Sequence, residues 1–230
     1  RDRLRSRGLG DVYKRQNEYL NGGVLMIRYP FIYNQVLQIY RDMDKISFPI
    51  EPDTIISRLT NCRMRTYRQF AETNGCSIRD VILLCESKSG CTHYDVANNR
   101  YLILWNSDSS GNNVEGRKRW TKAHELGHVI LKHLPLVVEP MLAEHGFNQM
   151  EAQDFEVEAD QFAATLLCPM PLFPMLGIKS SLDIQNIFGV SNEASNHRWD
   201  EYLKWQRYHR KTAWENDMKR VAMQKGITLL

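Results

Sequence analysis

The sequence lacks several features that would place it in a special class of protein. No stretch approaches the roughly 18 consecutive apolar residues that a membrane-spanning helix needs, so we do not expect a membrane protein. Its five cysteines are odd in number and form no Cys-x-x-Cys pair, which favours free thiols in a reducing compartment over a disulfide framework. We therefore expect a cytoplasmic, globular protein. The sequence carries no signal for its oligomeric state.

The chain also has little net charge once one segment is set aside. Residues 1–16 end in Asp-Val-Tyr-Lys-Arg-Gln, which resembles the translation of an adapter used in sequencing libraries. We interpret them as a disordered, non-native read-through, with Met26 as the native start. They carry six Lys/Arg and two Asp, so removing their +4 takes the formal charge from +3 to about −1. Without a basic excess, we do not expect a nucleic-acid partner.

One motif dominates what the sequence does contain. Residues 124–128 read His-Glu-Leu-Gly-His, within a proline-free stretch over 117–133 whose apolar residues recur at helical spacing. Positions four apart share a helix face, so His124 and His128 can present both imidazoles to one metal ion. Glu125 lies beside them, where it can take a proton from a metal-bound water and pass it to a leaving amine. The pattern predicts a zinc site with the chemistry of peptide hydrolysis.

The positions of two further residues in this predicted helix can also be interpreted. Gly127 costs about 1 kcal/mol relative to alanine in a helix interior, and its presence indicates that backbone or the metal site comes close on that side. His133 lies in the last turn, where positive charge suits the helix dipole. We interpret it as a helix-end residue rather than a metal ligand.

A third ligand is expected about one helix further along the chain. The sequence predicts a second helix that ends before Pro169, and Glu156 and Asp160 lie four residues apart on one face of it. A glutamate can complete the metal site, and an aspartate one turn later can accept the free N–H of a ligand histidine and fix its tautomer. We assign Glu151 and Glu158 instead to a solvated acidic face.

The two segments together resemble a known family. Thr-Lys-Ala-His-Glu-Leu-Gly-His and Glu-Val-Glu-Ala-Asp-Gln-Phe-Ala-Ala-Thr-Leu-Leu-Cys-Pro are similar to the ImmA/IrrE zinc metallopeptidases of the gluzincin group, over about residues 94–171. The chain departs from the family at Cys168, where a Met or similar apolar residue is usual. The resemblance implies one Zn²⁺ per chain, with ligands His124, His128 and Glu156, general base Glu125, and Asp160 as the hydrogen-bond partner of His124.

The resemblance also implies a substrate. The family is typically bacterial and encoded on mobile elements, and its characterised members cleave transcriptional repressors. We expect a zinc endopeptidase acting on a cytosolic helix-turn-helix repressor of a mobile element or stress regulon. The alternative is a non-proteolytic, zincin-like regulator that binds a repressor or DNA and uses zinc structurally. A structural zinc has four protein ligands, and no cysteine lies at ligand spacing within the two motifs, which favours the catalytic reading.

The remaining patterns predict an α+β fold. Apolar periodicity and alternation predict helices over 31–42, 54–59 and 77–86, and strands over 62–67, 91–96 and 101–106, the last two as a hairpin. We expect a zincin-like metallopeptidase domain over residues 17–175, with a small twisted sheet backed by helices. In zincins a sheet edge near the metal holds the substrate as an added strand. Which strand forms that edge stays open.

Two regions outside the motifs allow more than one interpretation of their function. Residues 134–148 are predicted to form a loop between the site helices, and His145 within it is a candidate for stabilising the oxyanion, with His93 and Tyr94 as alternatives. Residues 176–230 are predicted as a helical C-terminal region, part of which resembles a helix-turn-helix. Its second helix carries Arg198 but also acidic residues, so we interpret it as a structural helix pair, with DNA binding as the alternative.

Overall fold

The computed structural model describes residues 27–108, 114–134, 149–208 and 212–229. The predicted read-through over 1–16, the proposed start Met26 and the candidate His145 lie outside these residues. Within them, no helix combines the length and the apolar character needed to cross a membrane.

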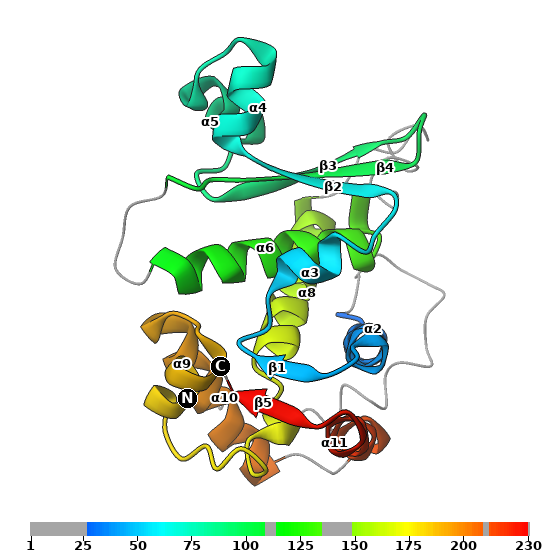
Figure 1. The fold of residues 1–230 in the computed structure, drawn as a ribbon, viewed down its shortest axis with the longest axis vertical. Helices are drawn as coiled ribbons and strands as arrows, with labels where there is room; N and C mark the ends of the chain where they lie inside the picture. The colour runs from blue at the N-terminus through cyan, green and yellow to red at the C-terminus, as the bar shows by residue number, and fades with distance from the viewer. Residues whose placement is uncertain (1–26, 109–113, 135–148, 209–211, 230) are drawn as a thin grey trace, which may run out of the picture.

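The described chain is a mixed α+β fold in which two small sheets are backed by helices (Figure 1). This confirms the predicted fold class, and it is consistent with a zincin-like domain. In chain order the elements are α2 (Tyr29–Asp42), β1 (Ile46–Phe48), α3 (Pro52–Ile56), β2 (Cys62–Thr66), α4 (Tyr67–Asn74), α5 (Ile78–Cys85), β3 (Gly90–Asp95), β4 (Arg100–Trp105), α6 (Val114–Ile130), α8 (Gln149–Leu167), η2 (Met170–Leu172), α9 (Ser181–Phe188), α10 (Asn192–Tyr208), α11 (Ala213–Lys225) and β5 (Ile227–Leu229).

The larger sheet has the order β2-β4-β3, with β2 parallel and β3 antiparallel to β4. The predicted hairpin is therefore β3–β4. The central strand is buried on both faces, as its apolar run indicated: Ile103 packs into the main core on the α6 side, and Leu104 packs into a smaller cluster with α4 and α5. Figure 1 shows the sheet lying between α6 and the α4–α5 pair. Among the described residues, β3 is an edge strand of this sheet.

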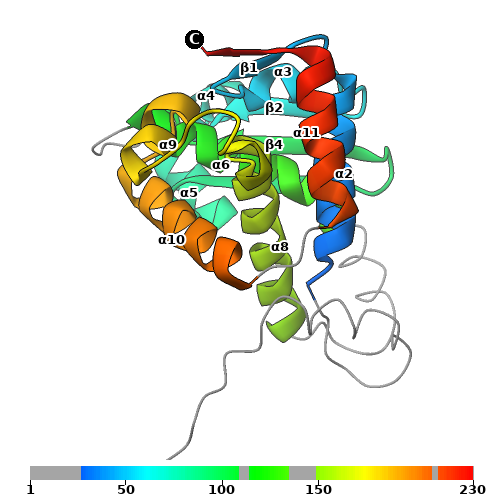
Figure 2. The same cartoon turned by 90° about the horizontal axis from the view of Figure 1, so that it is seen from below.

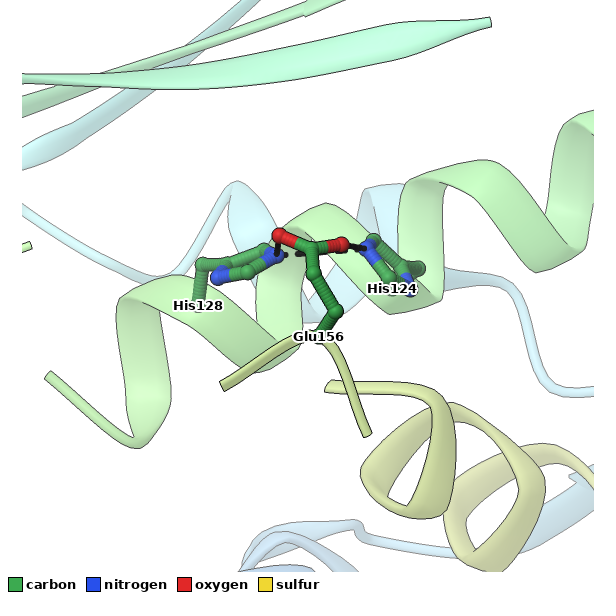
Figure 3. Close-up of side chains that lie close together, drawn as sticks. All are labelled: His124, His128 and Glu156. Carbon is green, nitrogen blue, oxygen red and sulfur yellow. Dashed lines mark hydrogen bonds and ion pairs between the residues drawn. The ribbon is translucent and has the colours of Figure 1, made fainter. Parts of the chain in front are cut away.

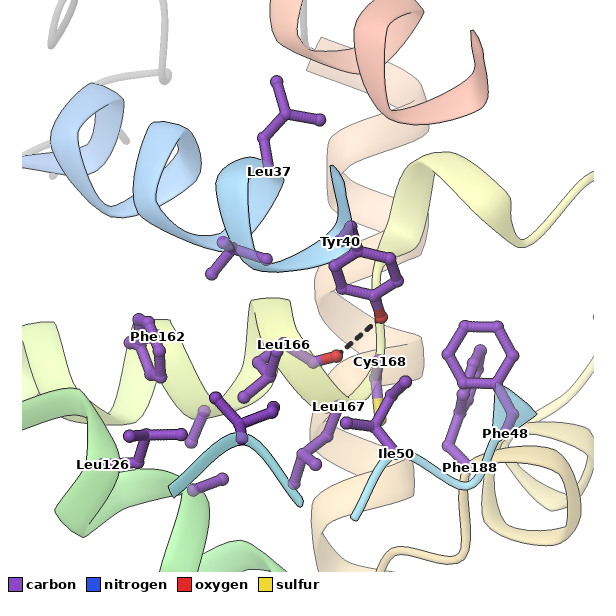
Figure 4. Packing of buried hydrophobic residues seen from close by; sticks show 14 of the residues in the cluster. Leu37, Tyr40, Phe48, Ile50, Leu126, Phe162, Leu166, Leu167, Cys168 and Phe188 are labelled. Carbon is purple, nitrogen blue, oxygen red and sulfur yellow. Dashed lines mark hydrogen bonds between the residues drawn. The ribbon is translucent and has the colours of Figure 1, made fainter. Parts of the chain in front are cut away.

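The main core forms where α6 and α8 pack against each other. Leu126 of α6 and Phe162 and Leu166 of α8 are fully buried (Figure 4). Gly127 permits this approach, because a Cβ there would lie 3.2 Å from the Cα of Ala159 and 3.2 Å from the ring of Phe162. The glycine is placed at the close approach that its position in the helix indicated.

The C-terminal region contributes to the same core. Its last strand, β5, pairs in parallel with β1, a strand pairing that sequence periodicity did not predict. Helix α11 lies along α2 (Figure 2), where the ring of Trp214 stacks on Tyr33 with centroids 4.4 Å apart. Helices α9 and α10 form the predicted helix pair around Gly189, whose φ is 59°. Arg198 of α10 is only 4% exposed and donates from Nε to the carbonyl oxygen of Cys168 at 2.9 Å, so it faces the core.

The cysteines differ from the expectation of five free thiols. Cys85, at the end of α5, and Cys91, in β3, form a disulfide with their Cα atoms 5.7 Å apart. That expectation is wrong for this pair, and the cysteine pattern no longer argues for a reducing compartment. Cys62 and Cys168 are free and buried, and Cys76 is free and exposed.

Candidate metal centre

Three side chains from two helices converge on one point. His124 and His128 extend from the same face of α6, and Glu156 reaches them from α8 (Figure 3). Nε2 of His124 lies 3.1 Å from Oε2 of Glu156, Nε2 of His128 lies 3.4 Å from Oε1, and the two Nε2 atoms are 3.2 Å apart. The structure thus brings together all three residues predicted as metal ligands.

The chemistry of this donor set fits zinc. The three ligand atoms lie within 4.8 Å of one another, and two imidazole nitrogens with one carboxylate oxygen are the protein ligands of many three-ligand zinc sites. Among the residues that the structure describes, no other group of three His, Cys, Asp or Glu meets the same distance criterion. The site therefore has the ligand types, and the mutual distances, that a divalent cation requires.

The predicted aspartate lies where it can orient one ligand. Nδ1 of His124 is 2.9 Å from Oδ1 of Asp160. Burial lowers the pKa of His124, but its hydrogen bonds to Asp160 and Glu156 outweigh burial and raise that pKa to about 10. The hydrogen bond from His124 in turn holds the pKa of Glu156 well below its usual range. Without a metal, the carboxylates of Asp160 and Glu156 stabilise the protonated ring of His124. Their negative charge would equally stabilise a bound metal cation.

Glu125 is held beside this group by a residue that sequence reasoning missed. It is 6% exposed, and its Oε2 accepts a hydrogen bond from Oγ1 of Thr92 at 2.6 Å. Burial raises the pKa of Glu125, although the Thr92 hydrogen bond acts in the opposite direction. No sequence signal pointed to Thr92, because only the packing of β3 on α6 brings it within reach.

Two residues for which the sequence predicted other roles lie behind His128. His133, predicted in the last turn of the helix, lies beyond the end of α6 at Ile130 and is 1% exposed, while remaining outside the group of candidate ligands. Nδ1 of His133 is 3.0 Å from Nδ1 of His128, and Nε2 of His133 is 3.0 Å from Oε2 of Glu158. Glu158 is 2% exposed, so its assignment to a solvated acidic face is wrong. Its spacing held the signal, since it lies three residues after Phe155 and four before Phe162 in the buried stripe of α8. The side chain of Glu151, assigned to the same face, lies outside the described ones.

Arg28, just before α2, completes the surroundings of Glu158. Its backbone N–H donates to Oε1 at 2.6 Å and its Nε lies 3.0 Å from both carboxylate oxygens. Burial alone would raise the pKa of Glu158, but the hydrogen bonds from His133 and Arg28 outweigh it and lower that pKa to about 2. Burial also lowers the pKa of His133, against the opposing effect of Glu158. Glu158 is thus a carboxylate.

The candidate ligands open onto a cleft of about 510 Å³. Edge strand β3 lines it from one side and α6 from another, and the disulfide pair Cys85 and Cys91 also contacts it. Of the alternatives for oxyanion stabilisation, neither His93 nor Tyr94 lines the cleft. Tyr94 instead donates to Oδ1 of Asn99 at 3.1 Å, in the hairpin turn.

A comparison with protein families matches residues 84–200 to Peptidase_M78, the IrrE N-terminal-like domain. The match spans more than half of the chain and includes the sheet strands β3 and β4 and both site helices. The chain belongs to the IrrE N-terminal-like family. This confirms the resemblance drawn from the two motifs and places the chain in a metallopeptidase family. A comparison with curated proteins found no match.

Within this IrrE-like domain, the arrangement separates into three chemical parts. The first is a set of three metal-ligand types at mutual distances suited to one ion. The second is a buried carboxylate, Glu125, on the adjacent position of the same helix. The third is an edge strand along the cleft, where a peptide backbone has hydrogen-bonding groups to meet.

Proposed function

We propose that this IrrE-like protein is a zinc-dependent endopeptidase that hydrolyses a peptide bond in a protein substrate. The observation that carries the proposal is the convergence of His124, His128 and Glu156 within 4.8 Å, with Glu125 next to them at the cleft. Three protein ligands rather than four are the pattern of catalytic zinc sites. A zinc ion held by these residues would polarise the substrate carbonyl and lower the pKa of a water molecule towards neutrality.

Glu125 supplies the proton transfers. Its carboxylate takes the proton of the attacking water and later delivers it to the leaving amine, so that one residue serves first as base and then as acid. Burial raises its pKa, which brings it nearer to the operating pH, where one group can both accept and return a proton. The hydrogen bond from Thr92 keeps the carboxylate oriented while its proton is gained and lost.

Edge strand β3 is the proposed binding site for the substrate backbone. Among the described residues β3 pairs only with β4, so its other edge has backbone groups that an extended peptide can meet as an added strand. The same strand lines the cleft and carries Thr92, which contacts Glu125. A peptide laid along β3 would therefore pass the residue that transfers the proton.

The substrate we propose is a cytosolic helix-turn-helix repressor, following the family resemblance. The test is to incubate the purified chain with zinc and the helix-turn-helix repressor encoded by a neighbouring reading frame, and to follow cleavage by mass spectrometry. The proposal expects one defined cut that disappears on chelation and with Glu125→Gln. Cleavage by Glu125→Gln at the wild-type rate would refute it. An uncut repressor that nonetheless binds the chain would favour a non-proteolytic regulator.

A further inference from the structure

A line of buried polar side chains runs from the metal centre to the start of α2. It begins at His128, passes through His133 to Glu158, and ends at Arg28. The two inner members are almost inaccessible, at 1% exposure for His133 and 2% for Glu158. Burying polar or charged groups is costly unless each is hydrogen-bonded. Here each buried member of the line has a neighbouring member as its hydrogen-bond partner.

The end of the line sets the direction of its hydrogen bonds. Glu158 receives donors from the backbone and the guanidinium of Arg28, and as a carboxylate it can only accept. The nitrogen of His133 that faces it, Nε2, must therefore carry a proton. The charge of Glu158 is already paired with Arg28, so a positive charge on His133, at 1% exposure, would be buried without a counter-charge of its own. The ring is therefore a neutral imidazole with one N–H, and its other nitrogen, Nδ1, is an acceptor.

This direction reaches the candidate metal ligand. Nδ1 of His133 lies 3.0 Å from Nδ1 of His128, so the nitrogen of His128 must be the donor. The lone pair of His128 is then on Nε2, the atom that faces Glu156 and His124. The opposite tautomer would direct a proton at the metal position and would set two lone pairs against each other at the His128–His133 contact.

We propose that His133, oriented by Glu158, is a positioning residue that keeps His128 in the tautomer able to bind the metal. This inference rests on the metal site of the proposed function. It gives both ligand histidines an orienting group that depends on α8: Asp160 contacts His124 directly, and Glu158 acts on His128 through His133. Glu156 and Glu158 are about 200° apart around the helix, which explains how neighbouring acids of one helix serve different sides of the site.

Packing is the competing explanation for a buried histidine. The ring of His133 stacks on Phe155 with centroids 4.6 Å apart, so any substitution there also changes packing. A pair of variants separates the two effects, because asparagine and leucine have nearly the same shape and only asparagine can present an acceptor near the position of Nδ1. His133→Asn and His133→Leu both lose the ring, and they differ in the hydrogen bond to His128.

The measurement is the zinc dissociation constant of the full chain by competition with a chromophoric chelator, with metal-free thermal unfolding recorded in parallel. Loss of such an orienting contact typically weakens metal binding about 10–100-fold. We expect His133→Leu to bind zinc at least about tenfold more weakly than His133→Asn. Equal constants for the two variants, with zinc still bound by wild type, would overturn the positioning role alone. Absence of zinc binding by wild type would overturn the metal site and this inference with it.

A second readout needs no substitution. Long-range ¹H–¹⁵N spectra of the histidine rings in the zinc-loaded wild type report which ring nitrogen carries the proton. We expect His133 to be protonated on Nε2 and bare on Nδ1. Protonation of His133 on Nδ1 would reverse the direction of the line and overturn the inference, whatever the variants show.

Discussion

Oγ1 of Thr92 lies 2.6 Å from Oε2 of Glu125, and this hydrogen bond joins the edge strand of the sheet to the proposed general base on α6. A hydrogen bond to a charged group contributes about 1.5–3 kcal/mol, enough to hold the carboxylate in one orientation. The strand proposed to bind the substrate is therefore the strand that positions the proton-transfer group.

Replacing Thr92 tests this link. Thr92→Val keeps the shape of the side chain and removes the hydroxyl, so we expect kcat to fall about tenfold or more, since each 1.36 kcal/mol in the barrier is a factor of ten. Zinc content should stay at the wild-type value, because the hydroxyl of Thr92 is hydrogen-bonded to Glu125, which is not one of the three candidate ligands. Thr92→Ser should recover most of the rate. A Thr92→Val enzyme with wild-type kcat would show that the hydrogen bond has no part in catalysis.

Glu125→Gln separates metal binding from catalysis. The amide has the shape of the carboxylate but cannot accept and return the proton, so we expect turnover to fall by roughly 10²–10⁴-fold, the usual contribution of general acid–base catalysis. The variant should still bind zinc and substrate, which makes it suitable for capturing the complex by size-exclusion chromatography. Loss of zinc together with activity would mean that Glu125 is needed to build the site.

Gly127→Ala probes how closely α6 and α8 must approach. Alanine favours a helix interior over glycine by about 1 kcal/mol, but its Cβ would lie 3.2 Å from the Cα of Ala159, and overpacking a core costs about 1–3 kcal/mol. We expect the cost of overpacking to exceed the gain in helix propensity, so the free energy of unfolding should fall. Zinc binding should also weaken, because α8 is pushed outward and Glu156 moves away from the two histidines. Urea unfolding and chelator competition measure the two effects. A more stable variant with unchanged zinc affinity would refute this.

The thiols should react in three steps. In the native chain at pH 7 only exposed Cys76 should react with a maleimide, because burial raises the pKa of Cys62 to about 11 and of Cys168 to about 12 and so suppresses their thiolates. Denaturation should expose these two, and reduction should then release Cys85 and Cys91. Intact-mass measurement counts the labels. Five labels after denaturation without reductant would show that this pair is not bonded.

The sequence predicted those parts of the site that follow from local helix geometry. The spacing of His124 and His128, and that of Glu156 and Asp160, determines which side chains share a helix face, and two helices packed together suffice to make them converge. The apolar run of β4 likewise predicted a strand covered on both sides. These inferences need only a few residues of sequence around each position.

What the sequence did not predict depends on contacts between distant segments. Thr92 reaches Glu125 only because β3 packs on α6, and Ile46 pairs with Ile227 across most of the chain. Glu158 was misread because its charge outweighed its place in the apolar stripe; its partners, Arg28 and His133, come from other elements. A buried charge can be recognised from sequence only when its partner is known, and here the partner is 130 residues away.

Metal content tests the central claim most directly. We expect one zinc per chain in the wild type, measured by mass spectrometry of metals after dialysis, and loss of that zinc in both His128→Ala and Glu156→Ala. Asp154→Ala is the matched control, since it removes an acid from α8 about 200° around the helix from Glu156 and should keep the metal. Zinc retained by Glu156→Ala, or absent from the wild type, would contradict the three-ligand site and the endopeptidase built on it.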